Sequence, residues 1–260
     1  MLSFRSSGNL DTGHGPIDKA WIRYGKVKDA LTDIKDWMNK HSEEIVVIYF
    51  GNMLGNVTEG HKMLKTMLEN EFSGLDGNVG LNDYWQKNQE WPTLKMAKES
   101  KQRVFAIVRT KTEEQAQLFF GSNVLPEKQY KFDKPASDLG SGNFIDVLST
   151  YQNINIGSKC KSIVDNIGKA CRDHPEVEFV KLAIFGTHAW LKNSPTKCLS
   201  KLARKCNQQV KNSIDICRNN GRANVNFLQV DYPNHPGPGL KTVVEIAHEE
   251  NKNHVSTLTS

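Results

Sequence analysis

The feature that most constrains the fold is the run 43–50, Glu-Glu-Ile-Val-Val-Ile-Tyr-Phe, which stops at Gly51. Its β-branched and aromatic residues predict a strand. The apolar residues do not alternate with polar ones, and this pattern is typical of a strand buried on both faces of a parallel sheet. Because parallel strands need crossover connections, the run predicts helices on either side of it.

The residues before this run predict the rest of a βαβ unit. A helix is predicted by apolar residues at helical spacing: Val27, Leu31, Ile34 and Met38. The run 1–5, Met-Leu-Ser-Phe-Arg, predicts a short strand that ends in a cation, and a polar loop with His14-Gly15-Pro16 follows it. Arg5 and His14 are therefore expected beyond the carboxyl end of a parallel strand, where α/β folds place their chemistry.

The same alternation of strands and helices continues along the chain. Further strands are predicted at 103–108, 179–185 and 225–230, and helices at 57–72, 93–100, 112–120, 163–171, 197–219 and 240–250. The segment 121–142 contains several Gly and Pro residues and is expected to be irregular. No repeat or second core is evident, so one α/β domain over residues 1–260 is predicted.

The net charge of the chain excludes few classes of function. Lys and Arg number 34 and Asp and Glu 29, a net charge of +5, which is compatible with anionic lipid headgroups but does not require them. No block of like charges suggests a nucleic-acid-binding arm. No apolar run approaches the roughly 20 residues that span a bilayer.

The cysteines bear on the compartment. All five lie in the second half of the chain, and a glycosylation sequon occurs at Asn56-Val57-Thr58. Together they favour a secreted protein with one or two disulfides and an odd thiol. The alternative is a cytoplasmic protein with free, buried cysteines. Met1 leads directly into the first strand, so no signal peptide is expected within this sequence.

Several motifs, in order, resemble one family. Arg5, the His14-Gly15-Pro16 loop, the helix and His41-Ser42-Glu43-Glu44-Ile45-Val46-Val47 match the strand, "HG" loop and "hP.EIV" strand of the phosphatidylinositol-specific phospholipase C X-domain family. Trp91-Pro92-Thr93-Leu94 ahead of the strand at 103–108 resembles its "WP.l" segment. The segment 217–232 resembles the approach to its last barrel strand. The fold that this resemblance implies is a PLC-like (β/α) TIM-type barrel, incomplete at its N-terminus.

The resemblance also implies roles for two residues. His14 matches the general acid and Arg5 the phosphate clamp, for which a planar guanidinium is well suited. The general-base histidine of the family belongs to an earlier strand that this sequence does not contain. Ser3 replaces an aspartate of the family motif, and no acidic cluster accompanies Arg5, so the metal-independent branch fits better. No metal ion and no cofactor are expected.

Four further residues follow predicted strands. Asp231 orients a catalytic histidine, or it caps a turn. Arg109 binds the substrate, or it is a solvated cation at a strand end. Tyr232 is expected to bind the substrate. His188 lines the pocket, or it is a loop histidine beside Trp190.

Two classes of function stay open. The first is a monomeric phosphodiesterase that cleaves a phosphoinositide, or a related phospholipid or glycolipid headgroup, at a peripheral membrane surface. The second is a catalytically impaired barrel that binds anionic lipid or inositol-phosphate headgroups, or a protein partner. Because the secreted branch of the family has cysteines near its last strand, at least one disulfide is expected among Cys198, Cys206 and Cys217.

Overall fold

The computed structural model describes residues 2–4, 10–14, 22–75, 79–82, 93–120, 122–131, 145–149, 160–175, 177, 179–184, 206–220, 225–229 and 241–258. The chain forms two compact units. The first contains Met1–Lys128 and Ser137–Ile145, and the second contains Gln129–Ala136 and Asp146–Ser260. A single domain over residues 1–260 stays a prediction.

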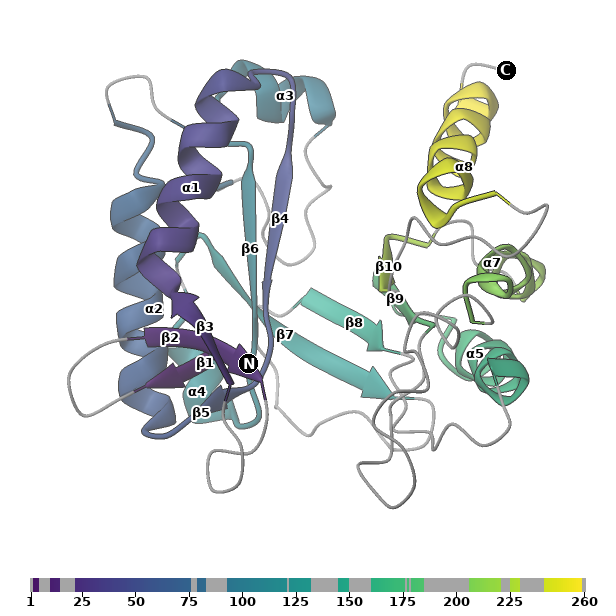
Figure 1. Ribbon diagram of the computed structural model, residues 1–260, viewed down its shortest axis with the longest axis horizontal. Coiled ribbons are helices and arrows are strands. Elements are labelled where there is room, and N and C mark those ends of the chain that lie inside the picture. The colour runs from purple at the N-terminus through teal and green to yellow at the C-terminus, as the bar shows by residue number, and fades with distance from the viewer. Residues whose placement is uncertain are drawn as a thin grey trace. The chain divides into compact units, whose positions relative to one another are not determined.

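A small sheet opens the first unit (Figure 1), with strands β1 (Leu2–Phe4), β2 (Leu10–His14), β3 (Ile22–Lys26) and β5 (Met53–Leu54). Their order is β3-β2-β1-β5, with β1, β2 and β3 antiparallel and β5 parallel to β1. The expected loop around His14 is therefore wrong, because His14 ends β2 and pairs with Ile22. Most residues of β2 are polar, so the sequence pattern does not predict a strand here. Leu10 and Asp11 of this strand are nevertheless buried.

The predicted crossover is present in the first unit. Helix α1 (Val27–Lys40) leads to β4 (Val46–Phe50), and β5 follows after two residues. The sequence predicted that β4 would be the parallel partner of β1. The parallel partner of β1 is instead β5, which follows β4 in the chain. Strand β4 itself pairs with β6 (Val104–Arg109). Helix α2 (Val57–Glu71) begins at Asn56, whose side-chain oxygen accepts a hydrogen bond from the Glu59 N–H at 3.3 Å.

The parallel strands of the first unit run in the order β4-β6-β7, where β7 comprises Val124–Lys131. The prediction of an irregular segment at 121–142 is wrong in this part. The prediction depended on Pro126, because proline cannot donate a hydrogen bond to a ladder and is uncommon inside strands. In the structure Pro126 nevertheless pairs in register with Val108. Two short helices flank β6, α3 (Leu94–Glu99) before it and α4 (Glu113–Gln117) after it.

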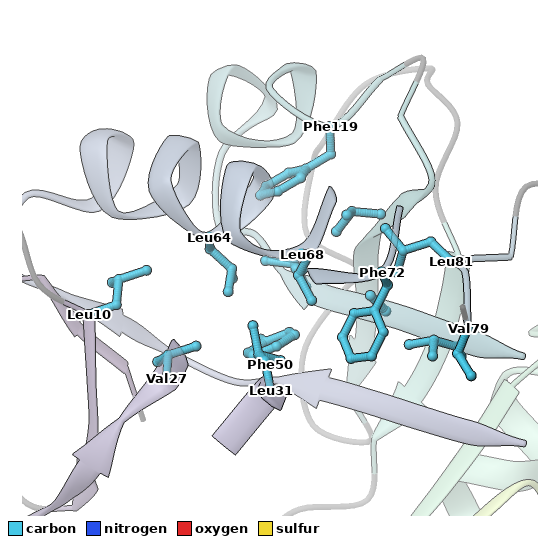
Figure 2. Close-up of a cluster of buried hydrophobic side chains, with 14 of the residues drawn as sticks. Leu10, Val27, Leu31, Phe50, Leu64, Leu68, Phe72, Val79, Leu81 and Phe119 are labelled. Atoms are coloured by element: carbon cyan, nitrogen blue, oxygen red, sulfur yellow. The ribbon is translucent and has the colours of Figure 1, made fainter. Parts of the chain in front are cut away.

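The core of the first unit lies between the helices and one face of these strands. Figure 2 shows side chains from β2, α1, β4 and α2 converging, together with Phe72, Val79, Leu81 and Phe119. The fully buried Leu64 and Leu68 of α2 lie one helical turn apart and face this cluster. The other face of β4 is less covered than the sequence predicted, because Val47 is 41% exposed. Among the described strands β4 is the last in the order, so its side chains have a neighbouring described strand on one side.

The second unit repeats the strand–helix alternation. Strands β8 (Ile145–Ser149), β9 (Phe179–Ala183) and β10 (Phe227–Gln229) are parallel and adjacent in that order. Helices α5 (Cys160–Asp173), α7 (Val210–Asn219) and α8 (Val243–Leu258) accompany them. The predicted strands at 179–185 and 225–230 are confirmed, whereas β8 was not predicted. The chain is thus a mixed α/β protein with parallel strands, compatible with an incomplete TIM-like barrel.

Two disulfides join α5 to the segment that contains α7. Cys160 bonds to Cys206 and Cys171 to Cys217, with Cα–Cα distances of 5.1 and 5.3 Å. At least one disulfide was expected among Cys198, Cys206 and Cys217, and this pairing is wrong for Cys206 and Cys217, which bond to cysteines of α5 and not to each other. Cys217 lies in α7, and Cys206 lies four residues before the start of that helix. Cys198 lies outside the described residues.

The disulfide-linked helices approach closely at Gly168, where an added Cβ would lie 2.9 Å from Ile216 Cγ2. We expect Gly168→Ala to lower the free energy of unfolding by about 1–2 kcal/mol, because Ile216 is β-branched and disulfides on either side of Gly168 oppose helix separation. Helix propensity alone predicts the opposite sign, a gain of about 1 kcal/mol. Chemical denaturation measures the change, with the exposed neighbour substitution Lys169→Ala as the control. A more stable Gly168→Ala protein would contradict the close packing.

A buried histidine makes the first unit sensitive to acid. His61 is 1% exposed, its ring nitrogens have no hydrogen-bond partner among the described residues, and it packs edge-on against Phe119. Burial lowers the pKa of His61 from 6.5 to about 4. Between these values the unfolded chain binds a proton that the folded chain does not, so stability falls as the pH falls.

We expect His61→Leu to remove this dependence. Its stability relative to the wild type should rise by about 2–3 kcal/mol between pH 7 and pH 4.5, at about 1.4 kcal/mol per pKa unit. Denaturation at a series of pH values measures it, and the exposed His248→Gln serves as the control. A difference that is independent of pH would show that His61 is protonated equally in both states.

Candidate functional site

The alternation of side chains along β4, β6 and β7 places three polar groups on one face of the sheet. Val46, Ile48 and Phe50 contact the helix-side core, so Val47 and Tyr49 face the opposite side. By the same alternation Arg109 of β6 and Glu127 of β7 lie on that opposite face, since Val108 and Val124 belong to the core. Tyr49 and Arg109 thus lie toward the carboxyl ends of β4 and β6, and Glu127 lies beside Arg109 in the middle of β7.

Glu127 is held by its neighbours. Glu127 is 0% exposed, and the Tyr49 hydroxyl donates a hydrogen bond to Glu127 Oε2. The buried Thr110 hydroxyl donates to the Glu127 backbone carbonyl at 3.4 Å. Arg109 is directly opposite Glu127 in the strand register. A buried carboxylate needs such partners, because an unpaired one would cost several kcal/mol to remove from water.

The charges of this cluster act on Tyr49. Burial raises the pKa of the Tyr49 hydroxyl, and the negative charge of Glu127 and the hydrogen bond to it raise that pKa further. The Arg109 guanidinium acts in the opposite direction and lowers the pKa, so it is close enough for its charge to be felt at the phenol. Tyr49 therefore stays protonated at neutral pH and acts as a hydrogen-bond donor.

Arg109 differs from the other two members. Its side chain is half-buried, and its guanidinium forms no hydrogen bond or ion pair with any residue in the described part of the chain. Guanidinium groups have five N–H donors in a planar fork that matches phosphate and carboxylate oxygens. The arrangement is therefore suited to an anion or a polyhydroxylated ligand at the carboxyl ends of the strands.

Of the six predicted site residues, Arg109 alone has a described side chain. His14 is the last residue of β2, and only its backbone is described. Arg5, His188, Asp231 and Tyr232 lie outside the described residues. Within the described ranges no three His, Cys, Asp or Glu side chains gather as metal ligands would.

Sequence reasoning missed Tyr49 and Glu127. Tyr49 was read only as part of an apolar run, and Glu127 lies in the segment that Pro126 made look irregular. The alternation of side chains along a strand is the signal that could have found Tyr49, because Tyr49 lies on the opposite face of the strand from Phe50. Glu127 could be found only once β7 and its register with Arg109 were known.

We expect Tyr49→Phe to destabilise the first unit by about 1–3 kcal/mol, because it removes a hydrogen bond from the buried Glu127 carboxylate. Denaturation measures the loss, and Tyr24→Phe, at a residue 70% exposed, is the control. Glu127→Gln should cost less in the Tyr49→Phe background than in the wild type, since the two residues are coupled. Additive effects would show that the pair is not coupled.

One comparison with known proteins gives a match. Residues 17–145 match the family model described as PI-PLC X 1, a segment that contains α1, α2 and the three site residues Tyr49, Arg109 and Glu127. No curated protein and no solved structure matches the chain. None of the helices in the described ranges is long and apolar enough to cross a membrane.

Proposed function

Since the chain belongs to the PI-PLC X-domain family of phosphatidylinositol-specific phospholipases C, we propose that it acts on the phosphodiester of a phosphoinositide or a related phospholipid or glycolipid headgroup. The proposed chemistry is acid–base catalysis without a metal ion. The proposal includes binding of anionic phospholipid or inositol-phosphate headgroups by a monomer at a peripheral membrane surface.

The observation that supports this best is Arg109. It lies at the carboxyl end of a buried parallel strand, where barrel enzymes bind their substrates, and no described residue satisfies its guanidinium. On the same face, Tyr49 and Glu127 form a polar pair that is fixed by burial. A headgroup with phosphate oxygens needs a cation, and the Arg109 guanidinium is one.

The proposed reaction assigns one role to each predicted residue. A ring hydroxyl adjacent to the phosphate attacks phosphorus, and the bond to the glycerol oxygen breaks as the cyclic phosphate forms. Arg5 stabilises the charge on the phosphoryl oxygens, and His14 protonates the leaving alkoxide. Asp231 orients a histidine, while Arg109, His188 and Tyr232 contact the headgroup. The roles of Arg5 and His14 come from the family resemblance, those of the other residues come chiefly from their positions after predicted strands, and only Arg109 has structural support here.

The two disulfides support the proposed compartment. Disulfides persist in oxidising environments and are rare in the cytosol, so Cys160–Cys206 and Cys171–Cys217 are consistent with a secreted or extracellular protein. A second function, headgroup binding without turnover, is the alternative. Turnover and binding measured on the same protein separate the two.

We expect Arg109→Gln to weaken inositol-phosphate binding by about ten- to a hundredfold, the effect of losing a charge-assisted hydrogen-bond pair of about 1.5–3 kcal/mol. The control is Lys95→Gln, at an exposed lysine that pairs with Glu99 on α3. Calorimetry with inositol phosphate and a phosphatidylinositol turnover assay are the measurements.

The same assays test the remaining roles. Arg5→Ala should also weaken binding, whereas His14→Ala should leave binding almost unchanged and lower turnover by about a hundred- to ten-thousandfold. An unchanged affinity of Arg109→Gln for inositol phosphate would show that the headgroup does not bind at Arg109. Efficient turnover in His14→Ala would move the acid elsewhere, with His188 the next residue to test. Binding without turnover in the wild type would favour the second function.

A further inference from the structure

We propose that Asn56 is an N-linked glycosylation site. Asn56-Val57-Thr58 is the one Asn-X-Ser/Thr sequon in the 260 residues, and its middle residue is not proline. A sequon by itself is common, so the inference depends on what the structure adds. It adds the exposure of the acceptor, the orientation of its amide and the disulfides of the same chain.

The acceptor asparagine is exposed and lies in a turn. It follows Gly55, which has a φ of +84°, and it connects β5 to the first residue of α2. A left-handed glycine gives a sharp change of chain direction, and the turn presents the next residue to solvent. A glycan attached to the unfolded chain during synthesis must fit on the folded protein, and the exposure of Asn56 meets this condition.

The helix cap fixes the amide in a useful orientation. Asn56 Oδ1 accepts the Glu59 N–H at 3.3 Å, so the carbonyl end of the amide points to the start of α2. The nitrogen, Nδ2, is the atom that a glycan would occupy, and this cap does not use it. An amide keeps its carbonyl oxygen after glycosylation, so the helix cap and the glycan are compatible at the same residue.

The disulfides provide an independent argument about the compartment. Cys160–Cys206 and Cys171–Cys217 form in an oxidising lumen, and the same lumen contains the glycosylation machinery of eukaryotic cells. The inference therefore rests on the secreted location in the proposed function, and not on the proposed phosphodiesterase chemistry. In the reaction Nδ2 loses a proton and bonds to the first sugar carbon of a lipid-pyrophosphate-linked oligosaccharide, and the lipid pyrophosphate leaves.

The experiment expresses the full chain behind a cleavable signal sequence in a eukaryotic secretory host. Cells and medium are analysed together, so that modification is detected even if secretion is slow. A peptide N-glycosidase, an amidase that releases the glycan and converts the glycosylated asparagine to aspartate, followed by peptide mass spectrometry, locates the site. Because the signal sequence imposes the compartment, a failure here concerns the site. A native protein that stays reduced in the cytosol would instead contradict the proposed location.

Three variants make the test specific. Thr58→Ala removes the sequon and keeps the Asn56 cap, whereas Thr58→Ser keeps both. Asn56→Asp removes the acceptor nitrogen and keeps an oxygen that caps α2 about as well, so loss of the glycan is separated from loss of helix stability. We expect glycan on the wild type and Thr58→Ser, and none on Thr58→Ala or Asn56→Asp. An unmodified wild type, or a glycan that persists in Thr58→Ala, would overturn the proposal.

Discussion

The Arg103 guanidinium connects the end of α1 to the start of the parallel sheet. Arg103 is 4% exposed, and it donates hydrogen bonds to the backbone carbonyls of Met38 at 3.0 Å, His41 at 2.8 Å and Glu44 at 2.7 Å. Carbonyls at a helix end have no partner within the helix, and burying them without donors is costly. One guanidinium thus provides hydrogen-bond donors for the carbonyls of the turn that separates α1 from β4, and the next residue, Val104, begins β6.

This arrangement determines where the site residues lie. The Arg103 carbonyl accepts the Val46 N–H at 3.0 Å, so the first rung of the β4–β6 ladder is set beside the buried guanidinium. From that rung Tyr49 is three residues along β4, and Arg109 ends β6. The side of β4 and β6 that faces the helix-side core is apolar, and the polar side chains of the cluster occupy the opposite side. The register that places the cluster near the carboxyl ends of β4 and β6 therefore begins at the opposite ends of these strands, where Arg103 binds the end of α1.

Patterns within one segment predicted most of the described helices and the strands β4, β6, β9 and β10. They failed where long-range pairing outweighs local preference. Leu10–His14 is polar and contains a glycine, yet it is a strand because β1 and β3 lie on either side of it. Pro126 argues against a strand locally, and β7 forms because β6 provides a ladder. The cation of the site, Arg109, was visible at a strand end, whereas Glu127 depended on a register that no local pattern specifies.

The disulfides show a signal that the sequence did contain. Cys160 and Cys171 are eleven residues apart, and so are Cys206 and Cys217, while each bridge spans 46 residues. Eleven residues complete about three helical turns, so Cys160 and Cys171 lie on one side of α5, while Cys217 lies in α7 and Cys206 four residues before its start. Because the first cysteine of one pair bonds to the first of the other, and the second to the second, α5 and the segment 206–217 run in the same direction. That direction is the one expected for successive helices of an α/β chain.

The two bridges also change how the chain responds to proteases. Each joins cysteines with a sequence separation of 46, and closing one such loop in the unfolded chain is worth about 4 kcal/mol in the loop-entropy model. The rings overlap between Cys171 and Cys206, and β9 lies in the shared part. A single cut anywhere in this shared stretch leaves the two fragments joined by both bridges. The second unit is therefore a covalently interlocked assembly, in which one broken peptide bond does not release β9 from its neighbours.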